Sequence, residues 1–321
     1  MMLNTANGKT PIESLGKTLM HEHLTVSFGG WEGDTSAPRR SREEAIRICV
    51  DQVEELKSGG YGALLDPCPN DLGRDVDLMG EVAARTGFKI LFAVGLYMDK
   101  LAGPYWRLKL AIDPDGEKRL AELFIREIED GVGSTGVKPA VIKVATGHAP
   151  FTRYEERVMK AAVAAATATG TPIITHTEGV DGDTQLATLT GHGIEPGRVI
   201  IGHSCANPDH GYHCRIVDAG AFIGFDRFGL ERLRSDEGRL ESLAQLIESG
   251  RGGRVIISHD CVFQMPGQLA PPNSPPMERS PMHFSRVLAP KLRDLGVSQA
   301  TIDSILTDNP RRYFEGPGGT A

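Results

Sequence analysis

The chain has 321 residues, of which 40% are hydrophobic and 24% are charged, and 35 Lys and Arg residues against 42 Asp and Glu residues give a net charge of −7. This composition is typical of a globular protein, and its mild acidity gives no electrostatic reason to expect nucleic acid or a membrane as a partner. The N-terminal segment lacks the pattern of a secretion signal, and no run approaches the roughly 18 apolar residues of a membrane span.

The cysteines are odd in number, unevenly spaced and free of any CxxC pair, so neither a disulfide framework nor a structural zinc site is expected. They are Cys49, Cys68, Cys205, Cys214 and Cys261. We therefore expect a reducing, cytoplasmic location.

Short apolar, β-branched runs alternate with longer amphipathic stretches along the chain. Near-continuous apolar character is typical of strands that are covered on both faces, as in a parallel sheet. The eight predicted strands are 17–25 (KTLMHEHLT), 61–67 (YGALLDP), 89–97 (KILFAVGLY), 140–147 (AVIKVATG), 171–179 (TPIITHTEG), 198–204 (RVIIGHS), 221–229 (AFIGFDRFG) and 254–261 (RVIISHDC).

The intervening stretches predict helices. Ser41 with Glu44, and Thr152 with Glu155, form capping-box patterns ahead of two of them. Many of these stretches stop at glycine, which readily adopts the left-handed conformation that ends a helix. These glycines are Gly59, Gly60, Gly87, Gly170, Gly220 and Gly250.

Eight strand–helix units in about 300 residues predict an α/β fold, a single (β/α)8 TIM barrel spanning residues 1–321. A doubly wound open sheet is the alternative, but no Gly-rich phosphate fingerprint follows the first strand. Residues 262–282 include a proline-rich stretch, 265–281 (MPGQLAPPNSPPMERSP). We expect it to form a long, stiff loop over the barrel mouth, with a solvated insertion as the alternative.

Five of the eight runs carry possible ligands near their C-terminal ends, and in a barrel these ends meet at the face where active sites are built. His21 and His23 are two residues apart, so alternation directs both rings to one side, whereas Glu22 points the opposite way and is expected to be structural. The full set comprises His21, His23, Lys143, His176, His203 and Asp260.

A single histidine in an apolar run is more often a core or surface residue than a ligand. The conjunction of four histidines, a lysine and a carboxylate is harder to explain, because burying them together is costly unless something binds them. Imidazole and carboxylate groups favour Zn, Fe, Co or Mn over calcium. The remaining histidines are treated as core or surface residues: His148, His192, His210, His213, His259 and His283.

The sequence resembles the phosphotriesterase family of the amidohydrolase superfamily, especially its lactonase-like and phosphotriesterase-related branch. The similarity covers nearly the whole chain and includes LGKTLMHEHL, LLDPCPNDLGRDV, VGLY, VIKVATG, PIITHTEG, VIIGHS, FDRFG, VIISHDC and DNPRRYF. It implies an amidohydrolase-like barrel with two divalent metal ions, zinc first and Co, Fe or Mn as alternatives. By this resemblance the deeper metal is held by His21, His23 and Asp260, and the more exposed one by His176 and His203.

The resemblance also implies that Lys143 carries a carbamate formed from CO2 and bridges both metals together with a hydroxide. An ammonium beside two dications would be costly, whereas a carbamate is an anionic oxygen ligand. A lysine that caps the strand end is the alternative. The family further implies a homodimer that acts on a small-molecule substrate.

The expected mechanism follows from general metal catalysis. Two cations lower the pKa of the bridging water, the exposed metal polarises a carbonyl or phosphoryl oxygen, and the hydroxide attacks. Asp260 would take up the proton as general base.

Four further residues are candidates for catalysis or substrate binding. Tyr97 resembles the tyrosine near the substrate carbonyl in lactonase-like members. The alternative is that Tyr97 is an ordinary residue at the barrel rim, where tyrosine is common. Arg227 matches the arginine of those members, and its alternative role is a salt bridge with Asp226 or another carboxylate. Cys261 and Phe263 follow the expected general base and are expected to line the pocket, with ordinary packing as the alternative.

Two positions depart from the family pattern. Ala206 stands where many members have aspartate, so that with Arg227 the His–Asp proton relay of organophosphate specialists is missing. Asp99 replaces a second tyrosine of some lactonases, which weakens the assignment of acyl-homoserine lactones as the substrate. The first expectation is therefore a lactonase or carboxylic esterase with promiscuous action on organophosphate triesters. The alternatives are an amidase for N-acylated small molecules, a dedicated phosphotriesterase and a metal-binding barrel without catalysis.

Overall fold

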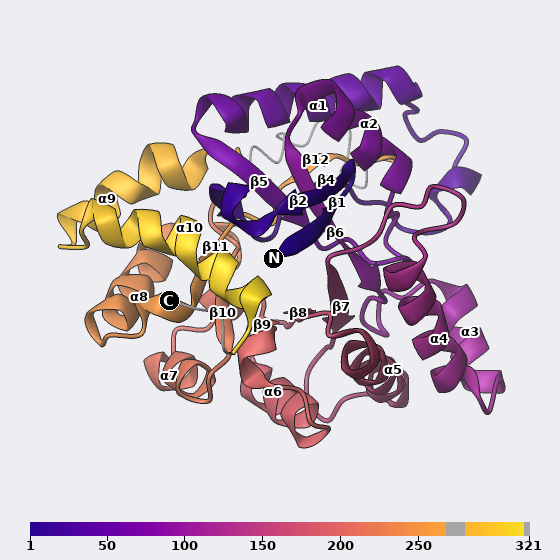
Figure 1. The fold of residues 1–321 in the computed structure, drawn as a ribbon. Coiled ribbons are helices and arrows are strands. Elements are labelled where there is room, and N and C mark those ends of the chain that lie inside the picture. Colours follow the sequence, from indigo (N-terminus) through magenta and orange to yellow (C-terminus); the bar gives the residue numbers. More distant parts are fainter. Residues whose placement is uncertain (268–279, 318–321) are drawn as a thin grey trace.

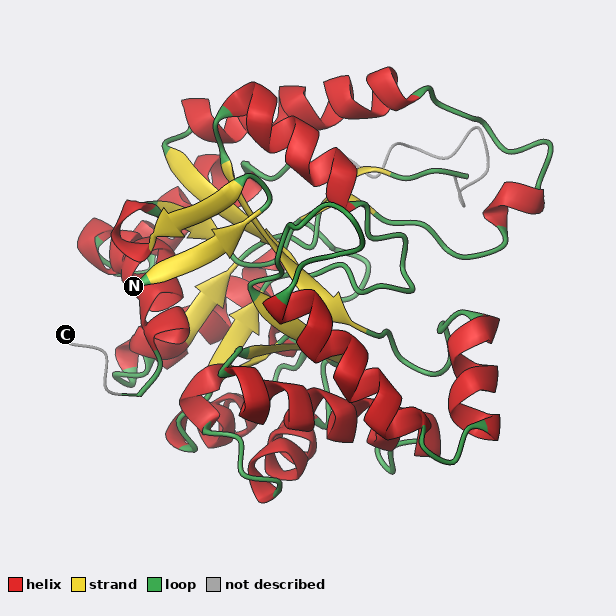
Figure 2. Cartoon of the chain, turned by 45° about the vertical axis from the view of Figure 1, so that its right-hand side comes forward, coloured by secondary structure: helices red, strands yellow, loops and turns green. Residues whose placement is uncertain are grey.

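The computed structural model describes residues 1–267 and 280–317. Eight parallel strands form one sheet in which consecutive strands are neighbours, and the helices lie around its outside (Figures 1 and 2). This arrangement confirms the predicted (β/α)8 barrel. The strands are β3 (Lys17–Leu19), β5 (Tyr61–Asp66), β6 (Lys89–Gly95), β7 (Val141–Ala145), β8 (Ile173–His176), β9 (Val199–Ile201), β10 (Phe222–Phe225) and β11 (Val255–Ile257).

The helices begin and end largely where the sequence signals place them. Thr152 and Glu155 form the expected capping box, while at Ser41 the hydroxyl accepts a hydrogen bond from Glu44 N, which is one half of the expected box. The helices are α1 (Arg42–Ser58), α2 (Val76–Thr86), α3 (Pro104–Ile112), α4 (Gly116–Glu129), α5 (Arg153–Thr169), α6 (Gly182–Gly191), α7 (His210–Asp218), α8 (Asp236–Glu248), α9 (Ala289–Asp294) and α10 (Gln299–Glu315).

The first predicted strand is divided in two. β3 ends at Leu19, and the chain bends before β4 (His23–Thr25), which pairs with β12 (Val262–Gln264) outside the main sheet. The bend forms because His21 N donates to Ser258 Oγ at 2.8 Å and Glu22 N donates to Leu65 O at 3.0 Å. The first of these bonds joins the start of the barrel to its last strand and helps to close it.

The predicted loop at 262–282 begins as β12, and its residues 268–279 lie outside the described residues. An N-terminal hairpin, β1 (Met2–Thr5) with β2 (Gly8–Pro11), was not predicted from the sequence. It shares an apolar cluster with the barrel interior and α10.

All five cysteines are free thiols. Among the described helices, none is long and apolar enough to cross a membrane.

Side chains of the strands alternate between two apolar clusters, one inside the barrel and one between strands and helices. In β6, Leu91 and Ala93 belong to the interior cluster and Phe92 to the outer one. In β7, Val141 belongs to the interior cluster, so alternation also directs Lys143 inward. The alternation of apolar side chains along each strand thus determines which polar side chains point into the barrel.

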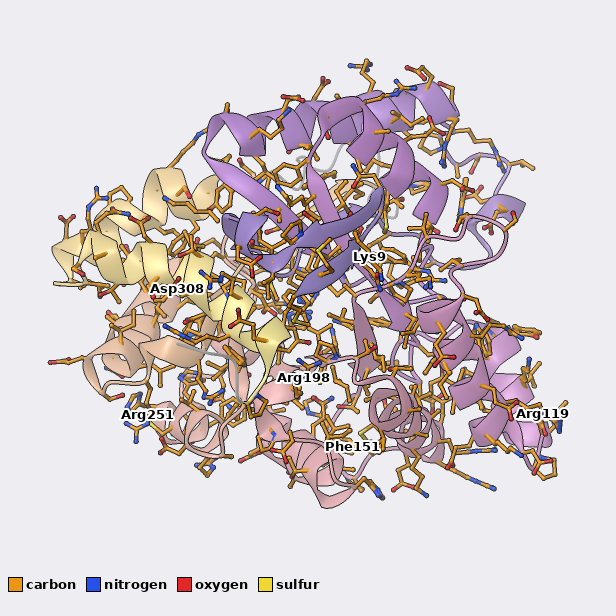
Figure 3. The ribbon with its side chains drawn as sticks, viewed as in Figure 1. Lys9, Arg119, Phe151, Arg198, Arg251 and Asp308 are labelled. Atoms are coloured by element: carbon orange, nitrogen blue, oxygen red, sulfur yellow. The ribbon has the colours of Figure 1, made fainter. Side chains whose placement is uncertain are left out.

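Exposed ion pairs lie on the outer surface of the molecule. Figure 3 labels Arg119 and Arg251 on this surface, where they pair with Asp113 at 2.9 Å and Asp218 at 2.7 Å. Such pairs contribute at most about 1 kcal/mol each. The two apolar clusters therefore supply most of the stability of the fold.

Gly95 lies where β6 approaches β7 beside Lys143. Its φ is 157°, and a Cβ there would lie 2.0 Å from the carbonyl oxygen of Lys143. We predict that Gly95→Ala lowers the free energy of unfolding by about 3 kcal/mol, because the backbone of both strands must shift. Gly87→Ala is the matched control, since Gly87 has a left-handed φ of 67° but a Cβ there would meet no atom within 4 Å. This substitution should lower the free energy of unfolding by only about 1 kcal/mol. Urea unfolding measures both, and equal losses would contradict the close-approach argument.

Candidate metal centre

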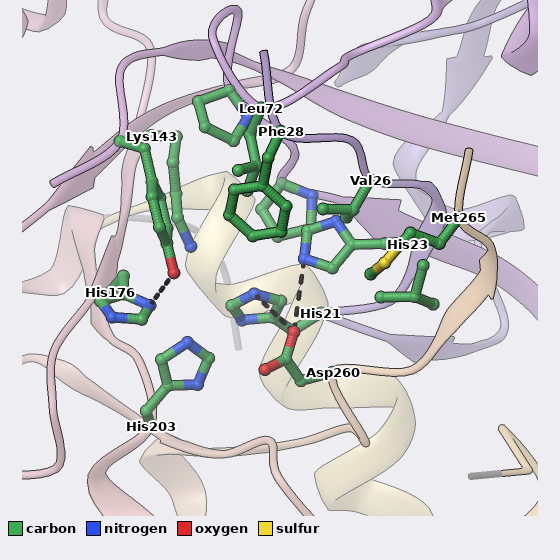
Figure 4. A pocket seen from close by; sticks show the side chains of 14 residues that line it. His21, His23, Val26, Phe28, Leu72, Lys143, His176, His203, Asp260 and Met265 are labelled. Atoms are coloured by element: carbon green, nitrogen blue, oxygen red, sulfur yellow. Dashed lines mark hydrogen bonds and ion pairs between the residues drawn. The ribbon is translucent and has the colours of Figure 1, made fainter. Parts of the chain in front are cut away.

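The six predicted ligands line one cavity at the C-terminal ends of the strands (Figure 4). Lys143 lies within β7 and His176 ends β8, whereas His203 and Asp260 lie in the segments that follow β9 and β11. Five separate segments therefore bring these side chains together, as the sequence predicted.

The imidazole rings are in mutual contact. The ring centroid of His21 lies 5.3 Å from that of His23 and 4.7 Å from that of His203, and His176 lies 4.6 Å from His203. Asp260 Oδ1 is 3.4 Å from His23 Nε2 and 3.9 Å from His21 Nε2 (Figure 4). The ligand atoms of His21, His23 and Asp260 all lie within 4.8 Å of one another, which is close enough to share a cation.

Two buried carboxylates hold the outer nitrogens of three of these rings. Asp66 Oδ1 lies 2.9 Å from His23 Nδ1, and the two oxygens of Asp226 lie 3.0 Å from His21 Nδ1 and His203 Nδ1. A carboxylate on Nδ1 fixes the ring and its tautomer, and leaves Nε2 directed at a metal. The sequence reading missed both aspartates in this role, although each stands at a strand end, in LLDP and FDRF.

Asp226 provides a test of this arrangement. Asp226→Asn should lower the affinity for zinc by about 10–100-fold, because the amide offers only one acceptor oxygen and no charge to two histidines. Titration of metal-free protein against a competing chelator measures the affinity. Asp218→Asn is the control, since Asp218 forms an exposed ion pair with Arg251, and its affinity should equal that of the wild type. Unchanged affinity in Asp226→Asn would contradict the supporting role.

His176 is held differently from the other three histidines. Its Nε2 lies 3.4 Å from Glu178 Oε1, and its Nδ1 lies 3.4 Å from the Tyr97 hydroxyl. The side chain of Glu178 is 38% exposed, whereas those of Asp66 and Asp226 are fully buried. His176 therefore presents the opposite nitrogen to the cavity and is supported from the solvent side. Glu178, two residues after His176 in HTEG, was also missed from the sequence.

The pKa values of three of the four histidines fit a ligand role. Burial lowers the pKa of His21 and of His203, and lowers that of His176 to about 4, so these rings are neutral at neutral pH. Burial also opposes the charged form of His23, but hydrogen bonds to two carboxylates, first Asp260, raise its pKa well above the usual value. Without a metal the imidazolium form of His23 is favoured beside Asp260, and a cation bound to both groups would have to displace that proton.

Lys143 is buried, with 2% of its surface exposed, and its Nζ donates to Thr175 O at 3.3 Å. Within residues 1–267 and 280–317, no carboxylate forms an ion pair with it. Burial lowers the pKa of Lys143 to about 8, with a smaller opposing effect from Asp260. The neutral amine, which is the form that reacts with CO2, is therefore much easier to reach near neutral pH than in a free lysine. Together with neutral imidazoles and a carboxylate, this donor set fits divalent ions of the zinc class.

Two of the predicted ligands have left-handed backbone conformations, which cost non-glycine residues of the order of 1–3 kcal/mol each. The φ angle is 61° at His203 and 52° at Asp260. Asp226 Oδ1 accepts from His203 N at 2.9 Å, and Glu22 accepts from the backbone nitrogens of His259 and Cys261 at 2.9 Å each. These carboxylates hold the strained segments in place, so Glu22 has the structural role expected of it.

Arg227 contacts the expected general base. Its Nε donates to Asp260 Oδ2 at 3.1 Å, so its salt-bridge partner is Asp260 rather than Asp226. Burial opposes ionisation of Asp260, but its hydrogen bond to His23 and the nearby charges of His203 and Arg227 hold its pKa well below the usual value. Asp260 is therefore a carboxylate at neutral pH.

An apolar wall faces the predicted metal ligands across the cavity. It is formed by Val26, Phe28, Leu72, Val262 and Met265. Cys261 and Phe263 were expected in this wall, but the cavity is lined by Val262 and Met265 instead, and Phe263 packs against the outer core cluster. Ile256 of β11 belongs to the interior cluster, so alternation directs Asp260 and Val262 toward the cavity and Cys261 and Phe263 away from it.

The barrel and its donor set define the class of barrel enzymes that hold metal ions at the C-terminal ends of their strands. Within this class, the chain belongs to the phosphotriesterase family, whose model matches residues 1–314. This membership makes it a metal-dependent hydrolase of ester bonds.

Relatives and solved structures match over nearly their whole length. A phosphotriesterase homology protein of Mycobacterium tuberculosis is 32% identical over 99% of this chain and 98% of its own length; an aryldialkylphosphatase of Saccharolobus solfataricus is 32% identical over 96% and 98%. An organophosphorus hydrolase from Deinococcus radiodurans superposes with a TM-score of 0.92 at 32% identity over 98% and 97% of the two chains. A mutant of a phosphotriesterase-like lactonase from the same organism gives 0.92 at 31% identity over 97% and 99%.

Proposed function

We propose that this protein is a binuclear metal-dependent hydrolase of lactones or related carboxylic esters, with weaker action on organophosphate triesters. The observation that carries the proposal is one cavity in which the six donors, Tyr97 and an apolar wall face each other. One metal would be held by His21, His23 and Asp260 and the other by His176 and His203, with a carbamate on Lys143 as their shared ligand. Zinc is the first candidate, and Co, Fe or Mn are alternatives.

When bound, the two cations supply Lewis-acid activation of the ester carbonyl and lower the pKa of a water molecule. The apolar wall binds the acyl part of the substrate and excludes water from it. Burial raises the pKa of the Tyr97 hydroxyl far above its usual value, so this group stays protonated and donates a hydrogen bond to the substrate oxygen beside His176.

Asp260 accepts the proton released from water when the new carbon–oxygen bond forms, and the ring carbon–oxygen bond of the lactone then breaks. Arg227 holds one oxygen of Asp260, so the other oxygen faces the histidine pair. The leaving alkoxide takes up a proton from Asp260 or from solvent. Because Arg227 and Ala206 replace a His–Asp relay, the proton path to solvent passes through Asp260 itself.

The relatives support this assignment without fixing the substrate, since their names include both a lactonase and organophosphate hydrolases. A panel on the zinc-loaded protein tests it. The panel contains aliphatic lactones, an acyl-homoserine lactone, an aryl ester, an N-acyl amide and a paraoxon-type triester. We expect kcat/KM to be highest for a lactone and at least about tenfold lower for the triester, a difference of about 1.4 kcal/mol in transition-state binding. Fastest turnover of the amide or triester would overturn the substrate class. Full metal occupancy without any turnover would favour a non-catalytic barrel.

A further inference from the structure

A second cavity lies between α3 and α5, two helices that contact each other on the same side of the barrel (Figure 1). Its volume is about 520 Å³, compared with about 140 Å³ for the metal cavity. Among the described residues, no side chain lines both cavities. The larger volume falls in the range of small-molecule sites, and the proposed mechanism makes no use of it.

The charged side chains of this cavity are mostly cationic. Arg107, Arg153 and Arg157 line it, against a single carboxylate, that of Asp99. Arg107 pairs with Asp99 at 2.8 Å, and Arg157 donates to the backbone oxygen of Asp113 at 3.0 Å, so these two arginines already hold parts of the fold. Arg153 is exposed, and its side chain forms no ion pair or hydrogen bond within residues 1–267 and 280–317. One guanidinium therefore remains for an anion.

Tyr154, the neighbour of Arg153 on α5, supplies a second donor. It lines the cavity and only 8% of it is exposed, yet its hydroxyl has no hydrogen-bond partner among the described residues. Burial raises the pKa of this hydroxyl most, and nearby charges, including those of Asp99 and Arg107 in the cavity wall, also act on it. The hydroxyl therefore stays protonated on the side of the cavity, and a buried donor without an acceptor is costly. An anionic ligand in the cavity would supply the missing acceptor.

The rest of the lining is apolar and comes from α3. Pro104, Leu108 and Ala111 are spaced by four and three residues, so they share one face of the helix, and the buried Leu110 completes the wall. The two donors, in contrast, are the first two residues of α5, where the helix dipole also favours a negative charge. A ligand that fills this cavity therefore needs an aliphatic part as well as a negative charge.

We propose that this cavity binds an aliphatic carboxylate, with the carboxylate group on Arg153 and Tyr154 and the chain against the apolar side of α3. A guanidinium donates two parallel hydrogen bonds that match the two oxygens of a carboxylate. The nearby carboxylate of Asp99 repels a doubly charged phosphate more strongly than a single negative charge. Two kinds of molecule share this chemistry: a fatty acid, and the hydroxy acid that forms when an aliphatic lactone opens. The second kind rests on the proposed function.

Isothermal titration calorimetry of octanoate into the zinc-loaded full chain tests this proposal. Arg153→Glu should weaken binding at least about tenfold, because it replaces the donor of a charge-assisted hydrogen bond with a like charge. Tyr154→Phe should weaken binding about threefold or more, as expected for one lost hydrogen bond. Arg47→Glu is the control, since Arg47 is 64% exposed on α1 and lines neither cavity, and it should bind octanoate like the wild type. A wild type that does not bind octanoate, or wild-type affinity in Arg153→Glu, would overturn the proposal.

Metal ions also bind carboxylates, so the titration is repeated on metal-free protein. The affinity for octanoate should be the same there, and Arg153→Glu should weaken it equally. Binding that disappears with the metal would belong to the metal centre and would overturn the proposal. Circular dichroism and thermal unfolding show that each variant is folded, and Arg153→Ala replaces Arg153→Glu if that variant fails to fold. Without ligand, Tyr154→Phe should be at least as stable as the wild type, because it removes a buried polar atom that has no partner among the described residues.

Octanol and inorganic phosphate test the two parts of the ligand separately. Octanol lacks the charge and phosphate lacks the chain, so each should bind at least about tenfold more weakly than octanoate. Octanol or phosphate that binds as tightly as octanoate would overturn the assignment to an aliphatic carboxylate.

The hydroxy acid 4-hydroxyoctanoate, the ring-opened form of γ-octalactone, distinguishes the two sources. Tighter binding than that of octanoate assigns the cavity to the hydrolysis product, and weaker binding assigns it to a fatty acid. Binding is measured without turnover, so a protein without lactonase activity could still bind octanoate. Failure of octanoate to bind would in turn leave the proposed function standing.

Discussion

Asp260→Asn is expected to lower kcat on the best lactone substrate by about 10²–10⁴-fold, the range for loss of a general base. Asp260 is ionised in the resting site and lies 3.4 Å from His23 Nε2, with Arg227 on its other oxygen. Asparagine keeps a ligand oxygen at this position but cannot accept the proton. The metal content should therefore stay near that of the wild type while turnover is lost.

Steady-state kinetics and elemental analysis of the same preparation separate the two roles of Asp260. Asp303→Asn is a matched control, since Asp303 pairs with Lys17 at 2.7 Å far from the cavity, and it should keep wild-type kcat. Retained kcat in Asp260→Asn would refute the proton-acceptor role. Loss of activity together with loss of metal would show that Asp260 acts only as a metal ligand and not as the proton acceptor.

Lys143→Ala is expected to lower kcat/KM by about 10³-fold or more, because the variant would lack the proposed anionic ligand shared by both cations. The proposed ligand forms when the neutral amine attacks CO2, giving a carbamate and releasing one proton. A short carboxylate such as acetate should restore part of the activity of Lys143→Ala, since it offers the same oxygens and fits the space left by the side chain. Acetate should not change the wild type.

The rescue distinguishes a carbamate from a simple lysine. If Lys143 acted through its positive charge, an amine such as ethylamine would rescue Lys143→Ala and acetate would not. Lys138→Ala, at a half-buried position before β7 where the ammonium donates to Glu129 O, controls for loss of a lysine in general. Carbon-13 NMR of protein equilibrated with labelled bicarbonate should show a carbamate signal that is missing from Lys143→Ala.

The barrel and the meeting of the six polar side chains at one cavity could be predicted because their signals are local. Apolar runs of strand length reveal the strands, and a polar residue at the end of such a run stands out. The parity of β7 then directs Lys143 into the barrel together with Val141. Once the barrel is predicted, six donors near strand ends are expected at the same face, without knowledge of contacts between distant residues.

The residues that support the predicted ligands could not be predicted, because their partners are identified only by contacts in the folded chain. Asp226 joins His21, 205 positions earlier in the chain, to His203, 23 positions earlier. In sequence it looks like any aspartate after a strand, so only the closed barrel reveals its partners. Glu178 is a similar case, since a glutamate at a loop start is usually solvated.

The lining of the pocket was misplaced because Cys261 and Phe263 were expected there only as the residues that follow Asp260. Ile256 of β11 belongs to the interior cluster, so alternation directs even-numbered residues inward, and Asp260 and Val262 line the cavity. Phe263 packs against the outer cluster, and Met265 reaches the cavity from beyond β12. The left-handed conformation of Asp260 is uncommon outside glycine and is held by distant contacts, so the sequence does not signal it.

The metal content of purified protein reconstituted with zinc tests the binuclear site most directly. We expect two ions per chain in the wild type, and fewer than two in His176→Asn while His23 and Asp260 still hold the other ion. Exposed His148→Asn should keep both. A wild type that binds no ion, or a His176→Asn variant that binds as many ions as the wild type, would contradict the account.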